Sequence, residues 1–146
     1  MREVASIDEL KTLVGQPIAV CEWMDVTQER IDAFAAATDD YQWIHVDRSR
    51  EGQRIAHGFL TLSLLPVMLS KSVRLLEPLT MTLNYGLNRL RFTNAVPAGA
   101  RVRNVSTPLR VDDDARGWKV TWSHLIEIEG AEKPAVVAEQ IVLYVR

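Results

Sequence analysis

Two side chains able to move protons, Asp40 and His45, lie five residues apart in the segment TDDYQWIHVDRSREGQR. The segment has the period of neither a helix nor a strand, which predicts an irregular loop with about one helical turn. A turn in such a loop can bring a carboxylate and an imidazole to one water molecule. Because histidine titrates near neutral pH, the two residue types make a workable acid–base pair. Taken singly, an Asp or a His in a loop is more often a turn former or a solvated group.

A second set of candidates lies at the start of the most apolar segment, residues 58–73, which is apolar nearly all round and predicts a helix buried on most sides. The first N–H groups of a helix lack intrahelical partners, and Gly58 has no Cβ to keep an acceptor away from them. His57 precedes this glycine, and Ser63 is one of few polar groups in the segment. A packed histidine is an equally good interpretation of His57, and Ser63 more commonly bonds to its own helix.

The elements that must position these residues are helices first and strands second. Ser6 and Thr27 are N-cap candidates for helices at 7–14 and 28–37, and Pro66 should bend the apolar helix. Alternating apolar residues predict strands over 18–24, 81–92, 100–111, 118–128 and 134–145, with a bulge near Asn88. This order predicts an α+β hot-dog fold, a curved antiparallel sheet wrapped around one apolar helix, as a single domain over residues 1–146.

The composition argues against several classes of protein. Seventeen basic and nineteen acidic residues are spread along the chain, with a net charge of −2, so no nucleic-acid partner is expected. The longest apolar stretch, 59–69, is too short and too interrupted to enter a bilayer as a span. The N-terminal segment carries acidic residues and no signal-peptide pattern, and the single Cys21 excludes an internal disulfide and a cysteine zinc cluster. A cytoplasmic location is therefore expected.

The segment FAAATDDYQWIH at 34–45 resembles the signature of MaoC-like dehydratases, the (R)-specific enoyl-CoA hydratase family. Asp40, Ile44 and His45 match that pattern, whereas Asp39, Gln42 and Trp43 replace its usual glycine, asparagine and proline. The segments IAHGFLTLSLLP, LNYGLNRLRF and PAVVAEQIVLYV are similar to the branch named after nodulation protein N. The stretch at 48–54 is shorter than in relatives, which leaves the shape of the substrate entrance open.

This resemblance implies reversible addition of water to a trans-2-enoyl thioester, carried by coenzyme A or acyl-carrier protein, with Asp40 and His45 as the catalytic pair. We assign Asp40 as the base and His45 as the water-orienting partner and proton donor, an allocation that could be reversed. The N–H groups beginning at Gly58, with His57 and Ser63 nearby, would bind the thioester oxygen. Arg89 and Arg91 are candidates for coenzyme A phosphates, although a solvated strand face is the commoner explanation. No metal and no separate cofactor are expected.

Two other functions fit a hot-dog fold, because the fold does not decide the reaction. A thioesterase usually carries a carboxylate on the central helix, and residues 58–69 contain neither Asp nor Glu. A non-catalytic subunit that binds acyl thioesters is the second alternative, although such a subunit has no need of an acid–base pair. An exposed edge strand favours pairing of two copies, so a homodimer is expected.

Overall fold

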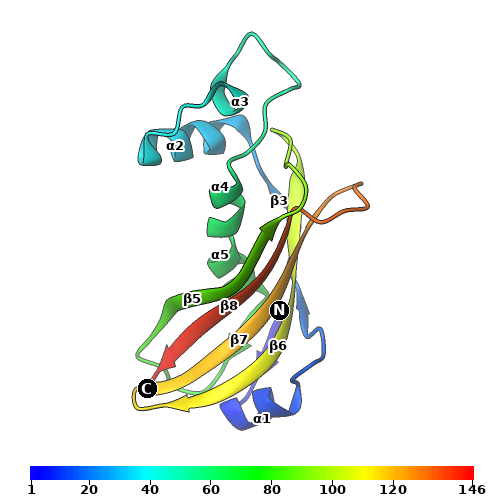
Figure 1. Cartoon of the computed structure of the whole chain (residues 1–146). Helices are drawn as coiled ribbons and strands as arrows, with labels where there is room; N and C mark the ends of the chain where they lie inside the picture. The colour runs from blue at the N-terminus through cyan, green and yellow to red at the C-terminus, as the bar shows by residue number, and fades with distance from the viewer.

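The computed structural model describes all 146 residues, and its thirteen elements follow the expected order of helices before long strands (Figure 1). The elements are β1 (Arg2–Val4), α1 (Ile7–Thr12), β2 (Ala19–Val20), β3 (Met24–Asp25), α2 (Gln28–Thr38), α3 (Trp43–Val46), α4 (Gly58–Ser63), α5 (Leu65–Ser72), β4 (Val73–Leu75), β5 (Met81–Phe92), β6 (Arg101–Asp114), β7 (Gly117–Ile128) and β8 (Val136–Val145).

A six-stranded antiparallel sheet forms the body of the protein, in the order β2-β6-β7-β8-β5, with β3 also paired to β6. The four long strands are those that the alternating pattern predicts. The register between β5 and β8 shifts between Asn84 and Gly86, and again between Leu87 and Arg89. The second shift leaves Asn88 without a partner, which confirms the predicted bulge.

The apolar segment forms a helical rod that lies along the concave face of this sheet (Figure 1). The rod is two helices, α4 and α5, joined at Leu64. Pro66 lies in the first turn of α5, where its missing N–H interrupts the ladder of hydrogen bonds. The bend expected at Pro66 is thus a break in the helix, and the sheet wrapped around a rod is the predicted hot-dog fold.

The N-terminal region departs from the sequence expectation in two places. The predicted strand over 18–24 is instead two short strands, β2 and β3, on either side of Cys21. Cys21 N donates to Asn104 O at 3.1 Å, but Asn104 N turns to the Cys21 sulfur at 3.1 Å instead of to its carbonyl oxygen. The side chain thereby takes the hydrogen bond that would continue the ladder. A parallel pairing of β1 with β4 has no signal in the sequence.

Two apolar clusters fill the space between the rod and the sheet. One surrounds Ile31, Leu65 and Met68, and the other surrounds Trp118 and Trp122. Several of the exposed large apolar side chains lie on the rod and the edge strand: Phe59, Leu83, Tyr85, Leu87 and Phe92. None of the helices combines the length and the hydropathy needed to cross a membrane.

Candidate active site

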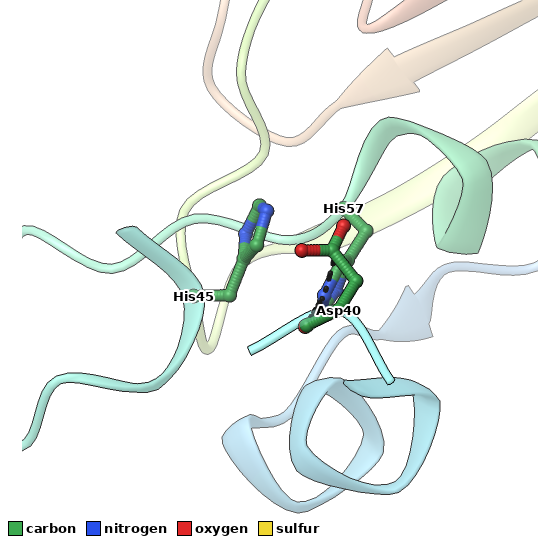
Figure 2. Close-up of side chains that lie close together, drawn as sticks. All are labelled: Asp40, His45 and His57. Carbon is green, nitrogen blue, oxygen red and sulfur yellow. Dashed lines mark hydrogen bonds and ion pairs between the residues drawn. The ribbon is translucent and has the colours of Figure 1, made fainter. Parts of the chain in front are cut away.

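Asp40, His45 and His57 come together at the end of the rod that faces α2 and α3. Asp40 follows α2, His45 lies in the single turn α3, and His57 immediately precedes α4 (Figure 2). One nitrogen or oxygen atom from each of the three side chains lies within 4.8 Å of the others. The predicted meeting of Asp40 with His45 is therefore present in the structure, with His57 as a third member.

His45 is held in one orientation by two hydrogen bonds. Its ring is buried, and Nδ1 lies 2.7 Å from the carbonyl oxygen of Ile55. A carbonyl oxygen can only accept, so Nδ1 carries the hydrogen and the neutral ring presents an unprotonated Nε2. The side chain of Gln28 donates to the His45 carbonyl oxygen at 2.8 Å and so ties α3 to α2. Sequence reasoning missed Gln28, because nothing local links it to a residue seventeen positions later.

The backbone conformation of Asp39 determines where Asp40 lies. Asp39 ends α2 in the left-handed region, with φ 57° and ψ 22°, where the family signature usually has glycine. Aspartate is one of the few residues that tolerate this conformation. The left-handed turn carries Asp40 out of the helix and toward His57, and its side chain stays half exposed at 53%. Asp39 is thus the C-cap of α2.

His57 connects the other two members of the cluster. Its Nε2–H donates to the backbone oxygen of Asp40 at 3.0 Å, and the Asp40 carboxylate lies 3.9 Å from the same nitrogen. Its ring stacks on His45 with centroids 3.7 Å apart and contacts Phe34 on the other side at 5.0 Å. Nδ1 of His57 is buried without a hydrogen-bond partner. His57 is therefore a packed histidine that contacts both other members of the cluster, and its role in binding the substrate stays a prediction.

A cavity of about 430 Å³ opens beside His45 and Gly58. A Cβ at Gly58 would approach the ring of Phe92 to 3.0 Å, so glycine keeps the aromatic wall close to the helix start. The first-turn N–H groups of α4 have no intrahelical acceptor and face this end of the rod. The lining is mostly apolar, formed by Ile44, His45, Ile55, Ala56, Gly58, Thr61, Phe92, Thr93, Asn94, Ala95, Val96, Ala135 and Val136.

Three other predicted residues lie outside this cluster. Ser63 is exposed and donates to the backbone oxygen of Phe59 at 2.6 Å, so it bonds to its own helix and does not brace the His45 loop. Arg89 and Arg91 lie on the exposed edge strand and do not line the site cavity. Their predicted contact with coenzyme A stays a prediction.

Two histidines and a carboxylate are also a familiar ligand set for transition metals. The stacked rings of His45 and His57 are only 24° from parallel. One possible ligand atom from each of Asp40, His45 and His57 lies within 4.8 Å of the others. Nδ1 of His45 and Nε2 of His57 are engaged with the backbone oxygens of Ile55 and Asp40, which leaves one nitrogen on each ring. The absence of a metal stays a prediction.

The fold and the site together are a hot-dog sheet and a helical rod that begins beside the cluster of Asp40, His45 and His57, with a mostly apolar cavity at its start. The MaoC like domain family matches residues 9–123. The chain is 43% identical to 3-hydroxyacyl-thioester dehydratase Z of Mycobacterium tuberculosis over 99% of each chain. It is 38% identical to nodulation protein N of Rhizobium meliloti, over 98% of this chain and 92% of that protein. The protein belongs to the MaoC-like dehydratase family and is a hydro-lyase of the predicted branch.

A comparison with solved structures agrees with this family. R-hydratase PhaJ1 from Pseudomonas aeruginosa superposes with a TM-score of 0.70, at 23% identity, over 91% of this chain and 82% of that one. At this identity the likeness supports the architecture alone, and it confirms the hot-dog fold.

Proposed function

We propose that the protein catalyses the reversible hydration of a trans-2-enoyl thioester to the (R)-3-hydroxyacyl thioester. One observation carries the proposal: a carboxylate oxygen of Asp40 and a ring nitrogen of His45 lie within 4.8 Å of each other, and His45 and Gly58 line the same cavity. A water molecule spans two acceptors at this separation with ordinary hydrogen-bond lengths. The 3-hydroxyacyl thioester named for the mycobacterial relative supports the substrate class.

In the hydration direction, the water donates one hydrogen to the Asp40 carboxylate and the other to Nε2 of neutral His45. Asp40 takes its proton as the water oxygen forms a bond with C3. The electron pair of the double bond moves toward the thioester, whose oxygen gains negative charge near the free N–H groups at Gly58. The Asp40 carboxylic acid then returns the proton to C2, which balances the reaction. Because Nδ1–H of His45 donates to the Ile55 carbonyl oxygen, the neutral ring orients water and does not donate at Nε2. In this proposal Asp40 therefore takes the proton-donor role that the sequence-based assignment gave to His45.

We infer that two copies pair through the edge strand. β5 has β8 as its single neighbour, so its outer row of backbone groups is free to pair. Phe59, Leu87 and Phe92 expose 65%, 43% and 45% of their surface along this edge and the adjoining rod. A second copy packed here would bury these side chains and enclose the half-exposed Asp40. Such a homodimer, in the cytoplasm and acting on coenzyme A or carrier-protein thioesters, is the form that we propose is active.

Hydration of crotonyl-CoA by Asp40→Asn and His45→Gln tests the mechanism. Each change should lower kcat by about 10²–10⁴-fold, the range typical of a positioned acid–base group, while circular dichroism stays native. Asp39→Asn is the matched control, because it makes the same carboxylate-to-amide change one residue away, at a position where asparagine tolerates the left-handed turn. Near-native turnover in either test variant would remove the mechanism.

The same reaction mixtures separate the competing functions. Chiral analysis should find the (R)-3-hydroxy product, and the (S) form would contradict the proposed stereochemistry. Release of free thiol faster than hydration would favour a thioesterase. Binding of acyl-CoA with no turnover by the native protein would favour a non-catalytic subunit.

A further inference from the structure

The turn that carries His45 is joined to α2 by a chain of three polar side chains. Gln28, the first residue of α2, donates from Nε2 to the backbone oxygen of His45 at 2.8 Å. The same nitrogen donates to Oδ1 of Asp32, one turn farther along α2, also at 2.8 Å. Arg48, two residues after α3, forms an ion pair with the other carboxylate oxygen of Asp32. The chain therefore runs from Arg48 through Asp32 and Gln28 to His45.

The side-chain amide of Gln28 has a single workable orientation in this chain. Its two partners, the Asp32 carboxylate and the His45 carbonyl, accept hydrogens and have none to donate. A reversed amide would place Oε1 of Gln28 against two other oxygens. The orientation present leaves Oε1 buried without a hydrogen-bond partner, which costs free energy. The fold thus gives up one hydrogen bond at Gln28 and keeps the two that hold the His45 turn.

A second set of contacts holds His45 by its ring. The carbonyl oxygen of Ile55 accepts from Nδ1 of His45, and the N–H of Ile55 donates to the Ile44 carbonyl oxygen at 2.9 Å. The short stretch 48–54 connects these contacts to Arg48. His45 is therefore fixed at its backbone by α2 and at its ring by the segment after α3.

Helix α2 holds both members of the proposed acid–base pair. Its C-terminal end leads through the Asp39 cap to Asp40, and its first residue, Gln28, holds the His45 turn. Figure 1 shows α3 beside α2. Side chains attached to a regular helix are placed more precisely than side chains on a free loop. Gln28 does not line the cavity beside Gly58, so it can act on the reaction only through other residues.

Resting on the proposed function, we propose that Gln28 is a positioning residue that holds the His45 ring at its distance from Asp40. A water molecule shared by the pair must be placed closely for its oxygen to attack C3, and small displacements slow such a step. Asp32 orients the amide of Gln28. Arg48 contributes least, because its side chain is 66% exposed and water weakens its ion pair.

Hydration of crotonyl-CoA by Gln28→Leu, Gln28→Lys and Glu29→Leu tests this role. Gln28→Leu removes both hydrogen bonds, so kcat should fall about tenfold, the fold-change of roughly one hydrogen bond. KM should change by less than about twofold, because Gln28 does not touch the substrate cavity. Gln28→Lys restores an N–H donor of similar reach and should recover most of the loss. Glu29→Leu is the matched control, since it places leucine at the next, exposed position and should keep native kcat.

A second comparison repeats Gln28→Leu in the His45→Gln background, with enough enzyme to measure the residual rate. A residue that acts only through His45 should lower kcat by less than about twofold in that background. A fall of about tenfold in both backgrounds, or a rise in KM at constant kcat, would overturn the inference. The first result would show that Gln28 supports the fold in general, and the second that it acts on binding.

Asp32→Ala provides the test if Gln28→Leu folds poorly. It removes the acceptor that orients the amide, at a partly exposed position, and should lower kcat by about threefold with KM unchanged. Native kcat in Asp32→Ala or in folded Gln28→Leu would overturn the inference while His45→Gln remains slow. Native protein that fails to hydrate crotonyl-CoA, or native turnover by His45→Gln, would instead contradict the proposed function.

Discussion

Replacing His124 by glutamine should remove a pH dependence of stability that the native fold carries. Burial lowers the pKa of His124 from 6.5 to about 4, against a weaker opposing contribution from Gln140. The unfolded chain therefore binds this proton near pH 6.5 and the native chain only near pH 4, so the native state loses stability as pH falls through that window. The full difference corresponds to about 3 kcal/mol, at about 1.4 kcal/mol for each pH unit. About 2 kcal/mol of it should be lost between pH 7.5 and pH 5.

Urea denaturation of both proteins at pH 7.5 and pH 5 measures this quantity. The other titratable groups are the same in both proteins, so their contributions cancel when the two changes in unfolding free energy are subtracted. His124→Gln replaces the ring with an amide, which can still form hydrogen bonds beside Asn104 and Gln140 but does not titrate. Native protein should lose about 2 kcal/mol more than the variant. Equal losses would refute the neutral, buried state of the ring, and a greater loss by the variant would reverse the sign of the reasoning.

Three further outcomes are expected. His57→Phe keeps a ring against His45 but loses the hydrogen bond to the Asp40 backbone, so kcat for crotonyl-CoA should fall up to about tenfold with little change in KM. His57→Gln keeps a donor, so its kcat should fall less. Equal activity of His57→Phe and native protein would contradict the positioning role of His57. Because the proposed proton transfers use only Asp40, His45 and water, hydration should survive dialysis against EDTA, and loss that added Zn²⁺ restores would overturn the metal-free mechanism. Sedimentation at micromolar concentration should find a dimer, and a stable monomer would count against pairing through β5.

Much of the fold follows from signals that act over a few residues. Ser6 and Thr27 accept hydrogen bonds from the third residue after each of them, as N-caps do, and the helices begin where these caps predict. Side-chain alternation over 81–92 and 118–128 predicts strands because successive residues of a strand point to opposite faces. The five-residue spacing of Asp40 and His45 likewise belongs to one short loop. These features need no knowledge of the rest of the chain.

The remaining features depend on contacts between segments that are distant in sequence. The sequence alone determined that a carboxylate, Asp40, and an imidazole, His45, share a loop. Only the tertiary structure decided that His57 stacks on His45 and bonds to the backbone of Asp40. It also decided that Gln28 bonds to the turn of His45 and that Ser63 bonds to its own helix. The buried side chains of Asn104, His124 and Gln140 likewise meet only because strands β6, β7 and β8 lie side by side. Periodicity specifies which face of an element is buried, whereas the register between elements specifies which buried groups meet.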